Sequence, residues 1–512
     1  MYSIDFFHKK NLSEPNEIIA IISKKLKIHK NCIENILIEK KSLDARNKKD
    51  IKWFYRIRFS CNKPLKGKVK KIIPESTPSL LLNGLKGKKV AIIGMGPCGI
   101  FAALRLAING AKCIIIERGN KLEERIKDVK TFFITRQLNE ESNIQFGEGG
   151  AGTFSDGKLT TRTKSPYHYF IFDELIKAGA PEEISYLSNP HIGTDRLRIV
   201  IKNLRNKLLS LGVEIYYNEK FEKLILDKNR NVKGLITSKR EITCDYIILA
   251  TGYSARDTYE SLFQQGVFME PKGFAMGFRM ELPQKKIDKM QYGRISKLLP
   301  PAEFFLNTHF KEFGLSVYTF CMCPGGIIVP ACSKKGFLVL NGMSYYKRSG
   351  FFGNAAVVIS LNPRIWNNTA FGGMELQKKI EQETFIAGGS DYTAPALTTK
   401  DFVEEKISFS LRKTSYPFGV KPYPIWEIFE EWKDFFKKAL IDFDKKMNGI
   451  ISDDVLLLAS ETRTSTPIRI TRGENGMSIN TKNLFPCGEG AGYAGGIVTS
   501  AADGLKIVEK II

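Results

Sequence analysis

The chain has 512 residues and 43% hydrophobic content, so it can bury substantial cores, and its length suggests about two to four domains. Its formal net charge of +24 comes mainly from lysines spread along the chain, which favours a generally basic surface over a dedicated nucleic-acid or lipid patch. Its nine cysteines include no C-x-x-C pair, which argues against a secreted disulfide framework and a zinc site. We therefore expect no metal and a reducing, cytoplasmic setting.

Signals for export or membrane insertion are absent from the sequence. The first residues lack a charged leader followed by an apolar segment, and no run of about 18 apolar residues is free of Gly, Lys or Arg. We expect neither secretion nor a membrane span, and nothing in the sequence indicates an oligomeric state.

Residues 1–84 are predicted to form a small α+β module. An apolar opening is followed by an amphipathic helical pattern at 16–28 and by strand-like runs at 33–38 and 51–60, which gives the order β-α-β-β. In the last run, alternation leaves one face to pack and the other to meet solvent or an anion. The Lys- and Pro-rich stretch 63–78 is the expected linker.

From residue 88 the pattern becomes strand, glycine-rich turn, helix and second strand. Gly94 permits the tight turn, Gly96 removes a side chain where the backbone must approach a pyrophosphate, and Gly99 allows close helix–strand packing. Glu117 ends the second strand and can accept hydrogen bonds from an adenosine ribose. This carboxylate disfavours the 2′-phosphate of NADP, although the adjacent Arg118 keeps that choice open. The unit predicts a dinucleotide site for FAD, NAD or NADP.

The last sixty residues favour FAD among these. They contain a strand at 483–485, a G-E-G turn at 488–490 and a helix starting near 495–497. The N-terminus of such a helix can stabilise the negative charge that reduction places on a flavin ring. Glu489 is placed for a pyrophosphate-side or ribityl contact. The alternative is a packed glycine-rich turn without a ligand.

Several motifs carry a family resemblance. The glycine fingerprint, CDYIILATGYSARD (244–257) and NLFPCGEGAGYAGG (483–496) resemble FAD flavoproteins with two dinucleotide-binding domains. More narrowly, the chain resembles the bacterial FAD-dependent dehydrogenase family often labelled "NAD(FAD)-utilizing dehydrogenase", through FGEGGAGTFSDGKL (146–159), PHIGTDRL (190–197), TFCMCPGG (319–326), ETRTSTPIRI (461–470) and the N-terminal KSLDARNKKDI (41–51).

The resemblance implies an α/β fold: a Rossmann-like FAD-binding domain of glutathione-reductase type, an inserted α+β substrate domain and the N-terminal α+β module. The expected boundaries are 1–84 for the module, 85–273 and 455–512 for the two parts of the FAD-binding domain, and 274–454 for the substrate or cap domain. The segment containing Asp156 is expected to run past the flavin edge. The cofactor residues implied are Gly94, Gly96, Gly99, Glu117, Arg118, Gly149, Gly150, Gly252, Gly488, Glu489, Gly495, Gly496 and Ile497.

Three residues are candidates for catalysis. Cys321 and Cys323 are expected two apart on one face of a strand, with Cys323 as a redox partner of the flavin or a covalent nucleophile, or else both as buried core side chains. Arg463 can clamp a substrate carboxylate or pair with Glu461 or another acid. His191 can act as a general acid or base or make a structural hydrogen bond.

The sequence favours an FAD-dependent oxidoreductase that moves a hydride or an electron pair between FAD and an unidentified small organic substrate. No second glycine fingerprint appears between about 200 and 480, so NAD(P)H, if used, docks as a transient co-substrate. The alternatives are a nucleic-acid-associated flavoprotein that uses Arg56, Arg58 and the lysines of 63–71, and an FAD-binding scaffold without turnover.

Overall fold

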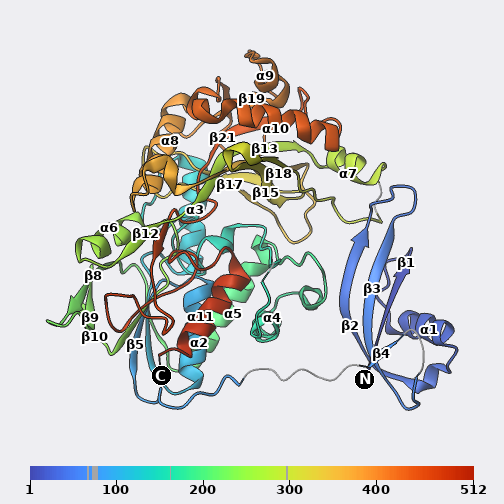
Figure 1. Ribbon diagram of the computed structural model, residues 1–512, viewed down its shortest axis with the longest axis horizontal. Helices are drawn as coiled ribbons and strands as arrows, with labels where there is room; N and C mark the ends of the chain where they lie inside the picture. Colours follow the sequence, from blue (N-terminus) through green and yellow to red (C-terminus); the bar gives the residue numbers. More distant parts are fainter. Residues whose placement is uncertain (66–68, 72–78, 162, 296–297, 512) are drawn as a thin grey trace.

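The computed structural model describes residues 1–65, 69–71, 79–161, 163–295 and 298–511 (Figure 1). The expected linker, 63–78, lies partly outside these residues. Within them, no helix is long and apolar enough to cross a membrane.

The N-terminal module is a four-stranded antiparallel sheet with one helix, in the predicted β-α-β-β order. The strands are arranged β2-β3-β1-β4. Helix α1 packs Ile18 and Ile22 against the inward-facing Tyr55, Ile57 and Phe59 of β3, all of them buried. The elements are β1 (Tyr2–His8), α1 (Pro15–Leu26), β2 (Ile33–Asp44), β3 (Lys52–Cys61) and β4 (Lys70–Lys71).

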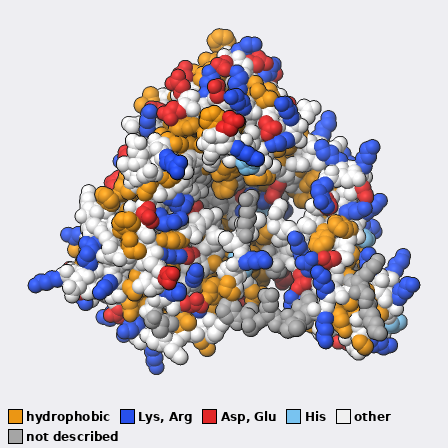
Figure 2. Space-filling model, in the orientation of Figure 1, with side chains coloured by type: hydrophobic (Ala, Val, Ile, Leu, Met, Phe, Trp, Pro, Cys, Tyr) orange, Lys and Arg blue, Asp and Glu red, His pale blue; other side chains and the backbone are white. Residues whose placement is uncertain are grey.

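Arg56 and Arg58, on which the nucleic-acid alternative depends, are both paired with carboxylates. Arg56 makes a two-bond contact with Asp5 (2.8 and 2.7 Å), and Arg58 donates to Glu39. The lysines of 63–71 lie partly outside the described residues. Basic and acidic side chains are interspersed over the visible face of the molecule (Figure 2), so this face shows no uniform basic surface.

A five-stranded parallel sheet, ordered β23-β11-β5-β6-β7, forms the dinucleotide-binding core. Its outer strand β23 comes from the C-terminal segment and pairs with β11. The sheet therefore combines strands from residues 89–249 with one strand from residues 484–486. Helices α2, α4, α5 and α11 pack on one face and the β8-β9-β10 sheet on the other (Figure 1). The elements are β5 (Lys89–Ile93), α2 (Pro97–Ile108), β6 (Lys112–Ile116), α3 (Leu122–Thr135), α4 (His168–Lys177), α5 (Thr194–Ser210), β7 (Glu214–Tyr216), β8 (Phe221–Leu226), β9 (Val232–Thr237), β10 (Glu241–Thr243), β11 (Tyr246–Leu249), α6 (Arg256–Gln264), β23 (Leu484–Pro486) and α11 (Ile497–Val508).

A seven-stranded sheet, ordered β14-β15-β18-β13-β21-β19-β20, lies above the first sheet in Figure 1. It includes β21, from the segment 455–512 that the sequence assigns to the FAD-binding domain; this strand pairs with β13 and β19 and is buried on both faces. The elements are β13 (Phe274–Pro283), α7 (Gln284–Tyr292), β14 (Asn307–Phe310), β15 (Leu315–Cys323), β18 (Phe352–Leu361), α8 (Gly372–Gly388), β19 (Ala394–Thr398), α9 (Thr399–Glu404), β20 (Val420–Pro422), α10 (Lys433–Lys446) and β21 (Leu456–Glu461).

Two short antiparallel pairs complete the fold. They are β12 (Met269–Pro271) with β22 (Ile468–Ile470), and β16 (Ile327–Pro330) with β17 (Leu340–Met343). The N-terminal module contacts the rest of the chain through its outer strand β2, where the Lys41 amide donates to the Tyr186 carbonyl (2.8 Å) and the Ser188 amide donates to the Lys41 carbonyl (3.0 Å).

Candidate functional site

A cavity of about 1110 Å³ extends from the carboxyl ends of the parallel strands to the seven-stranded sheet. The visible face of the molecule is hollowed in this region (Figure 2). Its walls come from the β5–α2 turn, the segment after β11, residues 145–161, the end of β15 and the start of α11. Ligands of open α/β sheets bind at such carboxyl ends. The cavity therefore joins the predicted dinucleotide site to the inserted sheet.

The three fingerprint glycines have the local geometry that their positions predict. Gly94 has φ +104°, and a Cβ there would lie 2.3 Å from the Ala250 carbonyl oxygen. A Cβ on Gly99 would lie 2.1 Å from the Gly94 carbonyl oxygen, so this glycine allows the close packing of helix and strand. Gly96 lines the cavity just before α2, and the nearest atom to its Cβ position, Gly150 Cα, is 3.8 Å away. Gly96 thus exposes backbone to a ligand.

Glu117 and Arg118 both line the cavity. Glu117 accepts from the backbone amides of Met95 (2.9 Å), Gly119 (2.9 Å) and Gly147 (3.0 Å), which joins the fingerprint turn to the 145–161 segment. Arg118 pairs with Asp257 and Glu141 and stacks over Phe146 with 4.0 Å between guanidinium and ring centroid. Arg118 is therefore held by carboxylates rather than left free for a phosphate.

Buried Arg125 of α3 organises the 145–161 segment. Its guanidinium donates to the carbonyls of Asn143, Gly147, Glu148 and Gly150 at 2.6–3.1 Å. These bonds hold the loop against the fingerprint turn. Gly150 lines the cavity, whereas Gly149 lies behind it with φ +85°, where a Cβ would meet Thr153 Oγ1 at 2.3 Å.

The start of α11 forms the opposite wall. Gly495, Gly496 and Ile497 line the cavity, and ideal Cβ positions on both glycines have no atom within 4 Å. Gly252, after β11, is equally open. Gly488 lies behind the wall, where a Cβ would come within 3.0 Å of Cys98. Two helix N-termini, those of α2 and α11, thus face one cavity through bare backbone.

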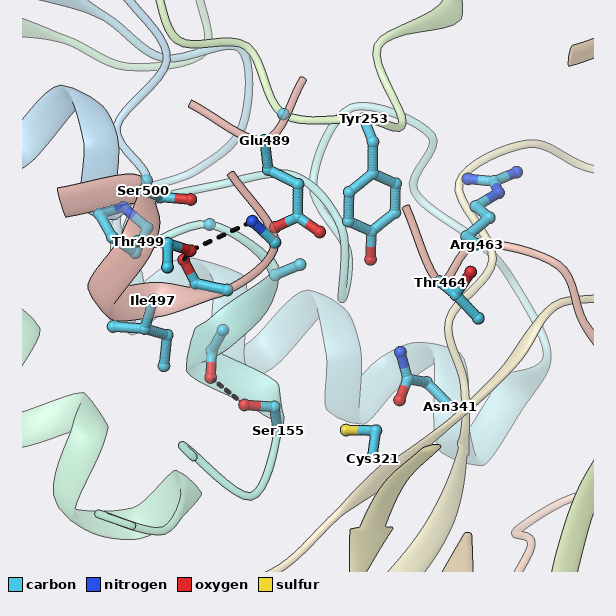
Figure 3. A pocket seen from close by; sticks show the side chains of 18 of the residues that line it. Ser155, Tyr253, Cys321, Asn341, Arg463, Thr464, Glu489, Ile497, Thr499 and Ser500 are labelled. Carbon is cyan, nitrogen blue, oxygen red and sulfur yellow. Dashed lines mark hydrogen bonds between the residues drawn. The ribbon is translucent and has the colours of Figure 1, made fainter. Parts of the chain in front are cut away.

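Glu489 projects toward the space between α11 and Tyr253 (Figure 3). Its carboxyl group makes no hydrogen bond within the part of the chain that the structure describes, and burial raises its pKa to about 7 although Lys272 opposes the shift. This half-buried carboxyl group can accept hydrogen bonds from a ligand in the cavity. FAD fits this donor and acceptor set: exposed amides for the pyrophosphate, an acceptor for ribityl hydroxyls and a helix N-terminus for the ring.

The cysteine at the cavity wall is Cys321, not Cys323. The Cys321 thiol projects into the cavity (Figure 3), whereas Cys323 is fully buried and does not line it. The two side chains do not share one strand face, because the β15–β18 pairing shifts register between Phe320 and Cys323 and Cys321 has φ +44°. The expected position of Cys323 beside the flavin is thus corrected to Cys321.

Arg463 lines the cavity, but its donors are occupied. It makes a two-bond ion pair with Glu381 (2.9 and 2.8 Å) and donates to Ser333 (2.6 Å) and Ser254 (3.2 Å). The partner is Glu381 of α8 and not Glu461. With its guanidinium bound in this way, Arg463 supports the cavity wall rather than offering a free clamp for a substrate carboxylate.

His191 lies outside the cavity lining. Its Nε2 is 3.0 Å from the Tyr346 carbonyl oxygen, and its ring stacks on that of Tyr346. Burial lowers the pKa of His191, with Arg348 acting in the same direction. These contacts match the structural hydrogen bond that the sequence leaves open, and they do not place the imidazole against a ligand.

Comparison with known proteins decides the family. A protein of Clostridium beijerinckii described as uncharacterized is 42% identical, over 98% of this chain and 97% of its own length. A model described as "FAD-dependent protein, C-terminal domain-like" matches residues 273–464, and one for a domain of unknown function matches 10–60. This chain belongs to one family with the Clostridium protein, and it carries the C-terminal domain of FAD-dependent proteins. The match to the FAD-dependent C-terminal domain ends at residue 464, after β21, which agrees with the place of that strand in the seven-stranded sheet.

Solved structures of two enzymes align with this chain over most of its length. Glycine oxidase from Bacillus cereus is 14% identical, with 83% of this chain and 94% of that chain covered and a TM-score of 0.30. A 3-ketosteroid-Δ4-(5α)-dehydrogenase from Rhodococcus jostii is 13% identical, with 83% and 96% covered and a TM-score of 0.35.

Four residues that shape the site of this family member escape sequence reasoning. Tyr253 and Lys158 line the cavity, whereas Arg125 and Arg279 are fully buried behind it. Tyr253 directly follows Gly252, a predicted cofactor residue, and this position is a signal that could have identified it. Nothing in a linear pattern marks Arg125 or Arg279, because their partners lie on segments distant in the chain.

Proposed function

We propose that this protein is an FAD-dependent oxidoreductase that moves a hydride or an electron pair between FAD and a small organic substrate bound beneath the seven-stranded sheet. The observation that carries the proposal is the continuity of one cavity from the N-terminus of α2 to Cys321 on β15. A cofactor and a substrate placed at its two ends would share one continuous space.

At the cofactor end of the cavity, two helix N-termini would contact different parts of FAD. Bound FAD supplies the electron chemistry, accepting or donating two electrons at its ring. The backbone N–H groups of Gly96 and Cys98 lie at the α2 N-terminus on either side of Pro97, which has no N–H, and their partial positive charge would stabilise a pyrophosphate there. Gly495 and Gly496 present the α11 N-terminus, which stabilises negative charge on a reduced ring without a cationic side chain.

The substrate end combines aromatic and polar groups. Tyr253, Asn341, Thr464 and Cys321 surround open space opposite α11 (Figure 3). Glu461 also lines this end, and burial raises its pKa to about 7 despite the ion pair with Arg279. A carboxyl group that titrates near neutral pH can hold or release a proton beside the substrate. This end suits a small uncharged or weakly polar organic molecule.

NAD(P)H is proposed only as a transient electron donor. The described dinucleotide fold uses its single fingerprint for FAD, so a nicotinamide would reach the ring by entering the substrate end of the cavity. The N-terminal module contacts residues 186–188, near Asn189 of the cavity lining, and is placed to influence access.

The test is anaerobic reduction of the FAD-loaded protein. We expect the purified protein to bind FAD and the flavin absorbance to bleach with at least one donor among NADH, NADPH and a panel of small hydroxy, amino and unsaturated compounds. Free FAD with the same donors is the control. If the bound flavin is reduced by dithionite but by none of these donors, the scaffold alternative is favoured over turnover.

A further inference from the structure

Cys321 and Cys323 lie at an irregular end of β15 that the fold supports from behind. The bulge turns the Cys321 thiol into the cavity and leaves Cys323 beneath it, with Cys323 Sγ 3.5 Å from the Cys321 carbonyl oxygen. Cys321 has φ +44°, a conformation that costs a non-glycine residue free energy and persists where the surroundings impose it. Both thiols therefore belong to one preorganised turn next to the cofactor space.

The support is Arg279 of β13, whose guanidinium is completely buried. Its Nη2 donates to the Cys321 carbonyl oxygen at 2.8 Å and lies 3.4 Å from Cys323 Sγ, while its Nη1 pairs with Glu461 at 2.8 Å. Gly342 leaves the room for it, since a Cβ there would lie 1.9 Å from Arg279 Nη2. The fold thus buries a cation directly behind two sulfur atoms.

A second cation faces the same sulfurs from the flavin-edge segment. Lys158 lines the cavity, and its ammonium group bonds to Asp156 and to the carbonyl of Met322, the residue between the two cysteines. Asp156 is held in turn by a two-bond contact with Arg348 (3.0 and 2.6 Å). Lys158 therefore connects the loop expected at the flavin edge to the C-x-C turn.

These contacts separate the two thiols in acidity. A hydrogen bond from Cys323, together with Lys158 and Arg279, lowers the pKa of Cys321 to about 6 against the opposing effect of burial. The same hydrogen bond and burial raise the pKa of Cys323. The pair thus combines a more acidic thiol that faces the cavity with a less acidic, buried thiol behind it, the arrangement in which one sulfur reacts first and the other resolves.

We propose that Cys321 and Cys323 form a redox-active dithiol that exchanges two electrons with FAD. This rests on the proposed function, because it requires FAD in the cavity. On oxidation, the Cys321 thiolate and the Cys323 thiol lose two electrons and one proton and form an Sγ–Sγ bond; FAD, the oxidant, takes up both electrons and the proton. In the reverse direction reduced FAD opens the disulfide. Cys321 is the sulfur that meets a substrate.

A second thiol pair in the cavity, Cys98 and Cys487, is an alternative redox-active dithiol. Cys98 and Cys487 have their sulfurs 3.1 Å apart and line the cavity at the start of α2. Burial raises the pKa of Cys487 well above its usual value, and it lies next to Asp503 (3.4 Å). That pair sits at the pyrophosphate end, and among the described residues neither Lys158 nor Arg279 donates to it, so the structure favours Cys321 and Cys323.

The test counts electrons in the FAD-loaded full-length protein. After mild oxidation with diamide and removal of the reagent, anaerobic titration with dithionite should consume four electrons per FAD in the wild type and two in Cys321→Ala and Cys323→Ala. Cys332→Ala, which removes a buried thiol outside the cavity, should retain four. Mass spectrometry should find the peptide containing both cysteines two hydrogens lighter in the oxidised wild type.

Alkylation gives a readout that does not depend on turnover. Iodoacetamide should modify Cys321 with a pH midpoint of about 6 in the wild type and a higher midpoint in Cys323→Ala. The inference is overturned if the wild type binds FAD but takes up only two electrons, or if the additional electrons disappear in Cys98→Ala instead. A protein that binds no FAD would contradict the proposed function rather than the dithiol.

Discussion

Gly96→Ala is expected to weaken FAD binding by about 100-fold while leaving the apoprotein folded. The added Cβ has no atom closer than Gly150 Cα at 3.8 Å, so the protein can accommodate it without strain. The methyl group nevertheless occupies the cavity wall at the α2 N-terminus, where a pyrophosphate must approach the backbone closely. Fluorescence titration of the apoprotein with FAD measures the effect, and thermal unfolding of the apoprotein checks the fold.

Gly99→Ala is the matched comparison, because Gly99 lies three residues further along the chain, in the first turn of α2. Its Cβ would lie 2.1 Å from the Gly94 carbonyl oxygen, so this variant should lower the melting temperature even without FAD. The two variants thus separate a ligand-facing glycine from a packing glycine. If Gly96→Ala binds FAD as tightly as the wild type does, the pyrophosphate does not bind next to Gly96.

Glu381→Ala is expected to lower the free energy of unfolding by about 3–5 kcal/mol. Glu381 is completely buried on α8 and pairs with Arg463 and with Arg256 at the start of α6 (2.8 Å). Removing it leaves two buried guanidinium groups without their carboxylate, and it disconnects α6 and the chain after β21 from α8. Chemical denaturation of the apoprotein measures the loss.

The control for this variant is Glu383→Ala on the same helix. The Glu383 side chain is 43% exposed and lies 3.9 Å from Lys379, so its removal should change the free energy of unfolding by less than about 0.5 kcal/mol. A similar small change in Glu381→Ala would show that the buried cluster is not a stabilising element.

The same carboxylate predicts how stability depends on pH. Arg256 and Arg463, acting against burial, lower the pKa of Glu381 from 4.5 to about 2 in the folded protein. Its contribution is therefore fully present above about pH 4.5 and is lost as the pH falls from there toward 2. In Glu381→Gln this part of the acid destabilisation should be absent, which unfolding curves measured between these pH values would detect.

Local sequence signals predicted the backbone geometry around the cofactor half of the cavity, whereas cofactor contacts by these residues stay a prediction. Glycine spacing, strand and helix patterning and the acid at Glu117 are short-range features, so Gly94, Gly96 and Gly99 occupy the conformations that their spacing implies. The C-terminal G-E-G turn and the start of α11 were placed in the same way. The alternation in β3 likewise predicted which side chains the N-terminal module buries.

The substrate half depended on contacts that no local pattern encodes. Arg463 pairs with Glu381, 82 positions away, and Arg279 reaches Glu461 across 182 positions. The expectation that two cysteines two residues apart share a face assumed a regular strand. The register shift in β15 broke that alternation and exchanged the roles of Cys321 and Cys323.

By itself, the sequence determined that this protein has a dinucleotide-binding fold whose sheet includes a strand from the C-terminal segment. This was possible because neighbouring residues determine the backbone geometry at glycines and at helix N-termini. Only the tertiary structure decided which side chains meet in the cavity. Packing of two sheets selects which buried charges pair, and a one-residue bulge selects which thiol faces the cofactor. Both are consequences of long-range contacts, which is why the reactive end of the site emerges only in the folded chain.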